Sequence, residues 1–120
     1  MKTCIVTIIK DEQSILDNFL QYHLDLGINH IFVFEDVDST SHKNITDKYS
    51  NVTLMNILDI FKEKKKYNQY IYFINAIWYI KKNYNYDWCF YIDIDEFITV
   101  NDTTLNNVIS LYKDYDALVL

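Results

Sequence analysis

The sequence predicts an α/β protein, a three-layer sandwich around a mainly parallel, Rossmann-like sheet. Short apolar runs rich in β-branched and aromatic residues alternate with segments of helical periodicity, an order typical of a parallel sheet with helices on both faces. Half of the residues are hydrophobic and 17% are aromatic, which is enough for a packed core. The chain has 120 residues, so residues 1–120 are expected to form one small domain.

The first half of the chain contains three predicted strands and two predicted helices. The first strand, residues 3–9, reads Thr-Cys-Ile-Val-Thr-Ile-Ile. The helix over residues 13–26 carries a mostly 3.6-residue apolar stripe and stops at Gly27. A Ser/Thr cluster follows the second strand and suits a loop and a helix cap. The other elements are a second strand over 30–34, a short helix over about 42–49, and a third strand over 52–57.

The second half is dominated by a long helix over residues 67–84, which is apolar nearly all round. Such a helix is buried on more than one side. A domain of this size covers that surface only in part, so we expect self-association through helix 67–84, or a further domain against it. A lysine-rich run at 62–66 precedes it and is read as a solvated loop or helix start. The remaining elements are a fourth strand over 88–94, a helix over 103–113, and a strand beginning at 117–120.

Short connections and right-handed crossovers predict the strand order 3-2-1-4. This order puts the first and fourth strands side by side, so Cys4 and Cys89 are expected to be neighbours in the core, as reduced thiols rather than a disulfide. The first ten residues are too short and too interrupted for a signal peptide. No apolar run approaches the ~20 residues of a membrane span. We therefore expect a cytoplasmic protein without a transmembrane segment.

The net charge of the chain is −6, which argues against nucleic acid as the main partner. Binding to nucleic acid is driven by basic patches that meet phosphates.

The segment 88–97, Trp-Cys-Phe-Tyr-Ile-Asp-Ile-Asp-Glu-Phe, carries the clearest chemical signal. Its apolar run leads directly into Asp93 and Asp95, which lie on the same side if the strand continues through them. Two converging carboxylates repel each other unless a cation or a shared proton lies between them. Mg²⁺ typically binds one or two carboxylates plus substrate phosphates. The segment therefore predicts a metal–diphosphate site, and the plainer alternative is that both acids open a solvated loop.

Acidic residues also follow the first two predicted strands. Asp11 and Glu12 come after the first strand, and Glu35, Asp36 and Asp38 come after the second. Ligands of such sheets bind beyond the carboxyl ends of the strands. Three acidic strand ends along one edge indicate a cleft.

Other residues that attract attention are better explained by packing. His23, on the first helix, is expected to be a packed or capping histidine, and His30 is expected to be structural. For Glu96 three roles are equally open: a hydrogen-bond partner of a metal ligand, a cap for the following residues, or a surface acid.

Three stretches together make the chain resemble the nucleotide-binding half of a GT-A glycosyltransferase of the family-2 and family-92-like group. They are Ile-Ile-Lys-Asp-Glu at 8–12, the stretch 19–34 with its Tyr-His and Leu-Gly-Ile-Asn-His, and Ile-Asp-Ile-Asp-Glu-Phe at 92–97. The resemblance covers nearly all of the chain. It implies a nucleotide-sugar donor and transfer of the sugar to an acceptor, whether glycan, protein or lipid.

The resemblance also implies a metal cofactor. In such enzymes the Asp-x-Asp pair holds Mn²⁺ or Mg²⁺ against the donor diphosphate. This maps onto Asp93 and Asp95 as metal-binding residues, with Asp95 as the direct ligand and Asp93 also at the donor.

Nucleotide contacts follow from the same resemblance. The loop Lys10, Asp11 and Glu12 is expected to lie against the nucleotide. Glu35 or Asp36, after the second strand, is expected to contact the base or the ribose.

Some assignments are looser. Gln69 and Asn75 match polar positions on the helix before the Asp-x-Asp strand, and Lys65 or Lys66 is a candidate point charge for a phosphate.

The sequence departs from the family pattern in two respects. Lys-Asp-Glu replaces the usual Lys-Asn-Glu, and Glu35-Asp36 replaces the usual Asp-Asn or Asp-Asp, so the nucleotide is not specified. The acceptor half, which carries the catalytic base of inverting members, would begin after Leu120. The catalytic residue is therefore unknown, and the chain is expected to be either a fragment or a degenerate domain.

Two other function classes compete with glycosyl transfer. The first is a non-catalytic nucleotide- or metal-binding module, or an interaction domain, which would bind without turnover. The second is a phosphotransferase with Asp93 as nucleophile. Enzymes of that kind place the Asp-x-Asp pair after the first strand, whereas here it follows the fourth.

Overall fold

The computed structural model describes residues 1–60 and 69–117 of the chain. Within these residues the strands form one four-stranded parallel sheet of order β3-β2-β1-β4, which confirms the predicted fold class and strand order. The strands are β1 (Thr3–Ile9), β2 (His30–Glu35), β3 (Val52–Asn56) and β4 (Trp88–Tyr91). The helices are α1 (Gln13–Leu26), α2 (Lys43–Thr46), α3 (Gln69–Asn83) and α4 (Leu105–Ser110), with a 3₁₀ turn at Ile57–Asp59.

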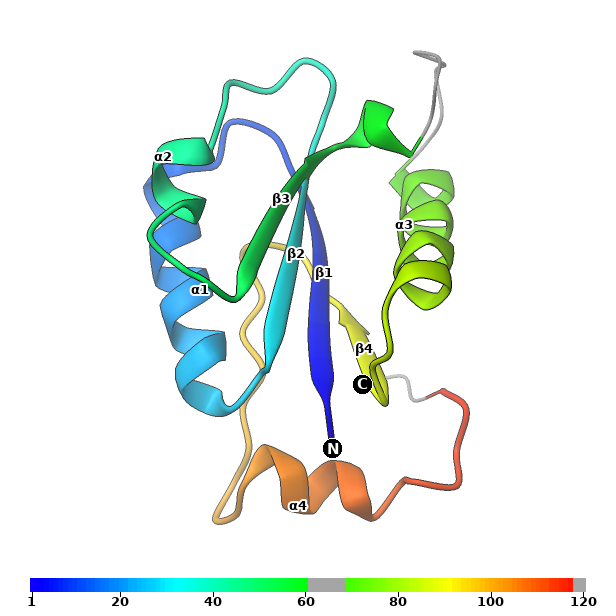
Figure 1. Ribbon diagram of the computed structural model, residues 1–120. Coiled ribbons are helices and arrows are strands. Elements are labelled where there is room, and N and C mark those ends of the chain that lie inside the picture. The colour runs from blue at the N-terminus through cyan, green and yellow to red at the C-terminus, as the bar shows by residue number, and fades with distance from the viewer. Residues whose placement is uncertain (61–68, 118–120) are drawn as a thin grey trace.

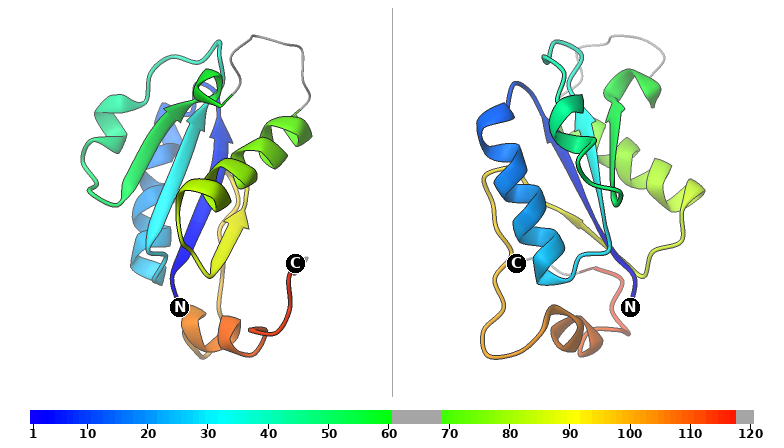
Figure 2. Two further views of the ribbon diagram at one scale, coloured as in Figure 1. Left: turned by 45° about the vertical axis from the view of Figure 1, so that its right-hand side comes forward. Right: turned by 60° about the vertical axis from the view of Figure 1, so that its left-hand side comes forward.

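Helices cover both faces of the sheet, as the predicted three layers require. Helices α1 and α2 lie on one face and α3 lies on the other, while α4 lies beneath the amino ends of the strands (Figure 1, Figure 2). None of the helices in the described part of the chain is both long enough and apolar enough to cross a bilayer.

Side-chain alternation along the central strands builds a separate core on each face. In β1, Ile5 and Ile9 belong to the cluster under α1, whereas Cys4 and Val6 belong to the cluster under α3. β1 and β2 lie in the middle of the sheet and are almost fully buried, which explains their continuous apolar sequence. β4 also contributes to both clusters, but it is half-buried because it is the outermost of the described strands on its side.

The predicted neighbours Cys4 and Cys89 face each other in register across β1 and β4, and both thiols are free. The hydrogen bond with Cys89, together with burial, raises the pKa of the Cys4 thiol strongly. Cys4 is therefore a packed, protonated thiol beside the free thiol of Cys89.

The fourth strand was predicted over 88–94 but ends at Tyr91, so that prediction is wrong at its carboxyl end. The chain leaves the ladder there because residues 93–96 close a turn of their own. The Glu96 N–H donates to the Asp93 carbonyl (3.0 Å), and the Asp93 N–H donates to the Glu96 carboxylate (2.8 Å). These bonds replace the ladder partners that a longer strand would need.

The shorter helices also differ from the predicted bounds. The expected helix 42–49 is a single turn, Lys43–Thr46, and the expected helix 103–113 is Leu105–Ser110. The long predicted helix 67–84 appears as α3, with residues 67 and 68 outside the described residues. The lysine run 62–66 is also outside the described residues, and so is the strand expected at 117–120 except Ala117, which is not in a strand.

Helix α1 ends at Gly27, as predicted, because the backbone there turns left-handed. Gly27 has φ 113° and ψ 8°, and its N–H donates to the carbonyls of His23 and Leu24 in the last turn of the helix. Glycine enters this region without the Cβ penalty that other L-residues meet.

We predict that Gly27→Ala lowers the free energy of unfolding by about 1–2 kcal/mol, the cost of a left-handed backbone in an L-residue. A Cβ at Gly27 would meet nothing within 4 Å, so the expected loss of stability comes from backbone strain and not from a steric clash. Urea denaturation measures it, with Gly27→Asn as the comparison because asparagine tolerates positive φ better. Equal stability of Gly27→Ala and the wild type would contradict this account.

Candidate functional site

The candidate site lies along the edge where the four described parallel strands end. Parallel pairing brings together the segments that follow β1, β2, β3 and β4, at the top of the sheet in Figure 1. The residues predicted to contact metal or nucleotide at the strand ends lie here: 10–12 after β1, Glu35 at the end of β2 with Asp36 after it, and 93–95 after β4. The structure divides them into an acidic turn after β4 and a hydrogen-bonded pair of loops after β1 and β2.

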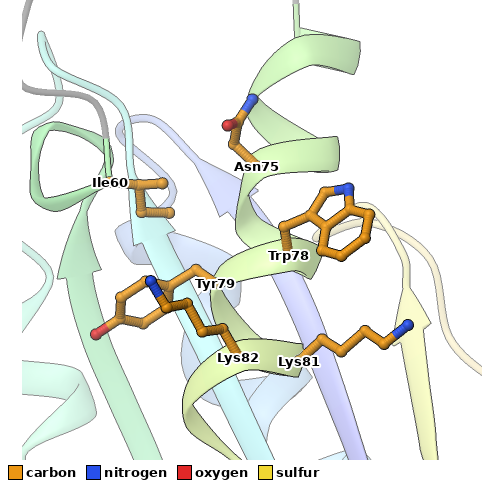
Figure 3. Close-up of a pocket in the computed structure, with 6 residues that line it drawn as sticks. All are labelled: Ile60, Asn75, Trp78, Tyr79, Lys81 and Lys82. Atoms are coloured by element: carbon orange, nitrogen blue, oxygen red, sulfur yellow. The ribbon is translucent and has the colours of Figure 1, made fainter.

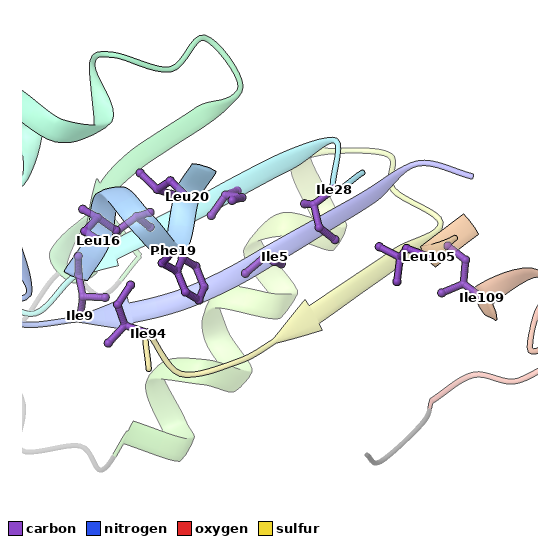
Figure 4. Packing of buried hydrophobic residues seen from close by; sticks show 11 residues of the cluster. Ile5, Ile9, Leu16, Phe19, Leu20, Ile28, Ile94, Leu105 and Ile109 are labelled. Atoms are coloured by element: carbon purple, nitrogen blue, oxygen red, sulfur yellow. The ribbon is translucent and has the colours of Figure 1, made fainter. Parts of the chain in front are cut away.

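The acidic turn, residues 93–96, is anchored by the one apolar residue inside it. Ile94 is only 7% exposed and packs in the cluster under α1 with Ile9 and Phe19 (Figure 4). Asp93 and Asp95, on either side of Ile94, are exposed. The alternation predicted for a continuing strand is therefore retained although the strand has ended, and the buried isoleucine makes a random solvated loop a poor description.

The three carboxylates of the acidic turn influence one another. The pKa of Asp93 is raised above its ordinary value of 3.8, first by burial and then by the negative charges of Glu96 and Asp95. Holding like charges together without a partner costs free energy, and a bound cation would relieve it. The turn therefore concentrates negative charge after β4.

Glu96 closes the acidic turn through a bond to Asp93, three residues before it, whereas the cap considered from the sequence was for the following residues. Its carboxylate accepts the Asp93 N–H, so this side chain closes the turn from within. The geometry gives Glu96 a structural task and leaves the carboxylates of Asp93 and Asp95 as the exposed pair.

The loop after β1 is held by the loop after β2 through Asp11. One Asp11 carboxylate oxygen accepts both the N–H and the hydroxyl of Thr40, each at 2.8 Å. The Asp11 N–H donates to the Ser39 hydroxyl at 3.0 Å. These bonds to Thr40 lower the pKa of Asp11 and support its left-handed backbone at φ 51°. Asp11 is therefore engaged within the protein, although it was expected to face the nucleotide.

Glu12 and Glu35 are joined through a buried histidine that the sequence did not single out. The Glu12 N–H donates to Nε2 of His42 (2.9 Å), so that nitrogen carries no proton. The Nδ1–H of His42 then donates to the Glu35 carboxylate (3.0 Å), which also accepts the His42 backbone N–H. His42 is 1% exposed and Glu35 is 8% exposed, so this chain of bonds is a structural link between the loops.

Lys10 and Asp36 are the predicted contact residues whose side chains take no part in the bonds between the two loops. Lys10 is exposed directly after β1. Asp36 is half-buried; its N–H donates to the Ile9 carbonyl (2.8 Å), and its carboxylate accepts the Asp38 N–H (3.3 Å). Of the two residues considered for the base or ribose, Asp36 is better placed than Glu35, because Glu35 is occupied by His42.

Sequence reasoning missed Thr40 and His42, the two partners that fix the loops. Both bind residues about 30 positions earlier in the chain. Local sequence patterns contain no information about such pairs. The only signal was the Ser/Thr cluster itself, which predicted a loop without its partners.

A hollow elsewhere on the surface is unrelated to the acidic edge. It has a volume of about 380 Å³ and lies against the outer side of α3, with Trp78, Lys81 and Lys82 along it (Figure 3). Asn75, matched loosely to a family position, also borders it and donates to the Ile71 carbonyl of its own helix (2.9 Å). Gln69 begins α3, and its side chain is outside the described residues. None of the residues predicted to hold metal or nucleotide lines this hollow.

Comparisons with known proteins assign no family. No protein-family model matches the chain, and no curated protein matches its sequence. Function is therefore inferred from the geometry of the strand ends, with the acidic turn after β4 and the loops after β1 and β2.

We predict that Asp93→Asn raises the Tm at pH 7 by about 1–3 °C, the size expected for one exposed like-charge contact. Because the folded-state pKa of Asp93 is raised, the contribution of this residue to stability is most favourable below pH 3.8. The contribution is lost as the pH rises through the folded-state pKa. The difference between variant and wild type should therefore vanish near pH 3. Scanning calorimetry at both pH values measures it.

The control for this prediction is Asp114→Asn, which removes the same charge at an exposed position after α4. An equal rise in Tm in both variants would show that the effect comes from net charge and not from the acidic turn.

Proposed function

We propose that this chain is the nucleotide-sugar-binding part of a metal-dependent glycosyltransferase. The donor would be held at the carboxyl edge of the sheet, and the sugar would pass to an acceptor that is a glycan, a protein or a lipid. The free thiols of Cys4 and Cys89 fit a reducing compartment, so we place this activity in the cytoplasm.

The observation that carries the proposal is the presentation of Asp93 and Asp95. Ile94 is buried between them, both carboxylates are exposed, and they stand at the strand end where ligands of parallel sheets bind. The described residues contain no group of three or more His, Cys, Asp or Glu side chains that could hold a metal ion. A cation at this pair therefore needs oxygen atoms from elsewhere, and a diphosphate supplies them.

The residues present suit Mn²⁺ or Mg²⁺, which prefer carboxylate oxygen. Asp95 is the direct ligand in this proposal, with Asp93 beside it. When bound, the metal acts as a Lewis acid that neutralises charge on the leaving nucleoside diphosphate. Glu96 keeps the turn closed, which would hold Asp93 and Asp95 in one turn before the ligand arrives.

The loops after β1 and β2 form the rest of the proposed donor site. Lys10 is exposed and would meet a phosphate as a point charge. Asp36 would contact the ribose or base. Asp11, Glu12 and Glu35 would shape the wall through their bonds to Thr40 and His42. The lysines suggested earlier for this task, Lys65 and Lys66, are outside the described residues.

A non-catalytic binding module is the second candidate function. It is favoured by the engagement of Asp11 and Glu35 within the protein, which leaves no described acid at this edge with an evident role as a base toward an acceptor hydroxyl. General acid–base help typically contributes ~10²–10⁴-fold to a rate. The two candidates differ in turnover and not in binding.

We predict that Mn²⁺ and a nucleotide-sugar bind cooperatively, because neither two carboxylates nor the diphosphate alone completes the metal shell. Isothermal titration calorimetry of Mn²⁺ against the chain, with and without each of a panel of uridine, guanosine and cytidine diphosphate sugars, measures the coupling. Asp95→Ala should weaken Mn²⁺ binding by more than about 10-fold. Loss of a residue that only hydrogen-bonds to a metal ligand already weakens binding by about 10-fold or more, and loss of a direct ligand should weaken it at least as much.

Asp114→Ala is the matched control, since it removes an exposed carboxylate after α4 and leaves the acidic turn intact. Nucleotide-sugar affinity that is the same with chelator and with Mn²⁺ would contradict the proposed metal role.

We further predict that the 120-residue chain alone shows no appreciable sugar transfer, because no acceptor wall or base has been identified at the acidic edge. A product assay with the bound nucleotide-sugar and a panel of acceptors tests this. Robust transfer would show a complete enzyme and remove the module as a candidate.

A further inference from the structure

The segment after the acidic turn is held against α1 by two adjacent side chains. From the turn the chain passes back beside α1 toward α4 (Figure 1, Figure 2). The Tyr22 hydroxyl donates to the Ile98 carbonyl at 2.7 Å, and the Ile98 N–H donates to Nε2 of His23 at 3.2 Å. Both backbone polar groups of Ile98 are thus satisfied by one dipeptide of α1.

The hydrogen bonds of His23 define a single tautomer. Nε2 accepts the Ile98 N–H, so the ring proton is on Nδ1, which donates to the Phe19 carbonyl at 2.9 Å. His23 is 0% exposed, and burial lowers its pKa despite the opposing effect of the Phe19 carbonyl. This geometry requires a neutral ring, because a proton on Nε2 would point at the Ile98 N–H and neither group could accept the hydrogen bond.

Aromatic packing reinforces the same contact. The Phe97 ring stacks on His23, with ring centroids 5.5 Å apart and an interplanar angle of 16°. It also meets Tyr22 edge-on at 5.0 Å. The residue directly after the acidic turn is therefore packed on the dipeptide that holds Ile98.

We propose that Tyr22 and His23 are positioning residues for the acidic turn, which they hold in the form that binds a metal–diphosphate. This inference rests on the proposed function. The turn is fixed on one side by Ile94 in the core and on the other by Ile98 on α1, and Asp95 lies between these two anchors.

The second anchor matters because the turn carries repelling charges. Asp93, Asp95 and Glu96 lie within four consecutive positions, and without a cation the repulsion between their carboxylates favours an opened turn. The bonds between Asp93 and Glu96 and the two fixed ends of the turn oppose this opening. A turn that is already closed loses less conformational entropy when the ligand binds, so its affinity is higher. Weakening the Ile98 anchor should therefore weaken metal–diphosphate binding without touching a metal ligand.

Tyr22→Phe tests the proposal with the smallest possible change, the loss of one hydroxyl. The matched control is Tyr49→Phe, which removes a tyrosine hydroxyl that donates to Asp17 of α1 (2.6 Å), outside the acidic turn and its anchors. A second pair tests His23. His23→Gln keeps an acceptor that can reach the Ile98 N–H, whereas His23→Asn is too short to reach it.

Two measurements are made on each variant of the 120-residue chain. Amide hydrogen exchange followed by NMR reports the protection of Ile98. Calorimetry with Mn²⁺ and uridine or guanosine diphosphate reports affinity. We expect faster Ile98 exchange and about 3- to 10-fold weaker Mn²⁺–diphosphate binding in Tyr22→Phe, the effect of one hydrogen bond. His23→Asn should show the same defects, His23→Gln should be closer to wild type, and Tyr49→Phe should be unchanged.

The failures of the two proposals are distinguishable. If the wild type binds Mn²⁺–diphosphate and Tyr22→Phe binds it equally well despite faster Ile98 exchange, the positioning role is refuted and the proposed function stands. Equal affinities in His23→Gln and His23→Asn would also count against it. If the wild type binds no Mn²⁺–diphosphate, the proposed function fails, and Tyr22 and His23 then position no metal site.

Discussion

The burial of Ile94 beneath α1 is the constraint on which the candidate site depends. β4 ends at Tyr91, so no ladder hydrogen bond extends through the acidic turn. The turn is nevertheless defined, because Ile94 packs with Ile9 and Phe19 in a core that also holds β1 and α1 together. The same hydrophobic cluster that stabilises the fold thus determines which way Asp93 and Asp95 face.

The carboxylates of Asp11, Asp17 and Asp93 fall into two classes according to their surroundings. Asp11 and Asp17 accept hydrogen bonds from neighbouring side chains, Thr40 for the first and Tyr49 and Lys48 for the second, and their pKa values are lowered. The pKa of Asp93 is raised by burial and by like charges. Carboxylates of the first class stabilise the native loops, whereas Asp93 would be stabilised by a cation that the protein itself does not supply.

Helix α1 connects these features. One face of the helix fills the core with Leu16, Phe19 and Leu20. Its last turns carry Tyr22 and His23, which hold the chain just after the acidic turn. Helix α1 therefore contributes both to stability and to the proposed ligand site, and substitutions in it should be tested for effects on each.

The sequence by itself determined the fold class, the strand order and the position of most elements. Strand β1 and helix α1 have the predicted bounds, because alternation of period 2 and a stripe of period 3.6 are local properties that neighbouring residues establish together. Gly27 ends α1 as expected for the same reason. The Asp-x-Asp pair was also visible, since an apolar run that leads into two acids is a local pattern.

Only the tertiary structure decided where β4 ends, which acids are already engaged, and what holds the acidic turn. Asp11 with Thr40, Glu35 with His42 and Tyr22 with Ile98 are joined by hydrogen bonds whose partners no periodicity identifies. Two of these three pairs are separated by 29 and 76 positions along the chain. Such bonds form when the packing of separate layers brings distant backbone and side-chain groups within reach, and that packing is a property of the whole fold and not of any one segment.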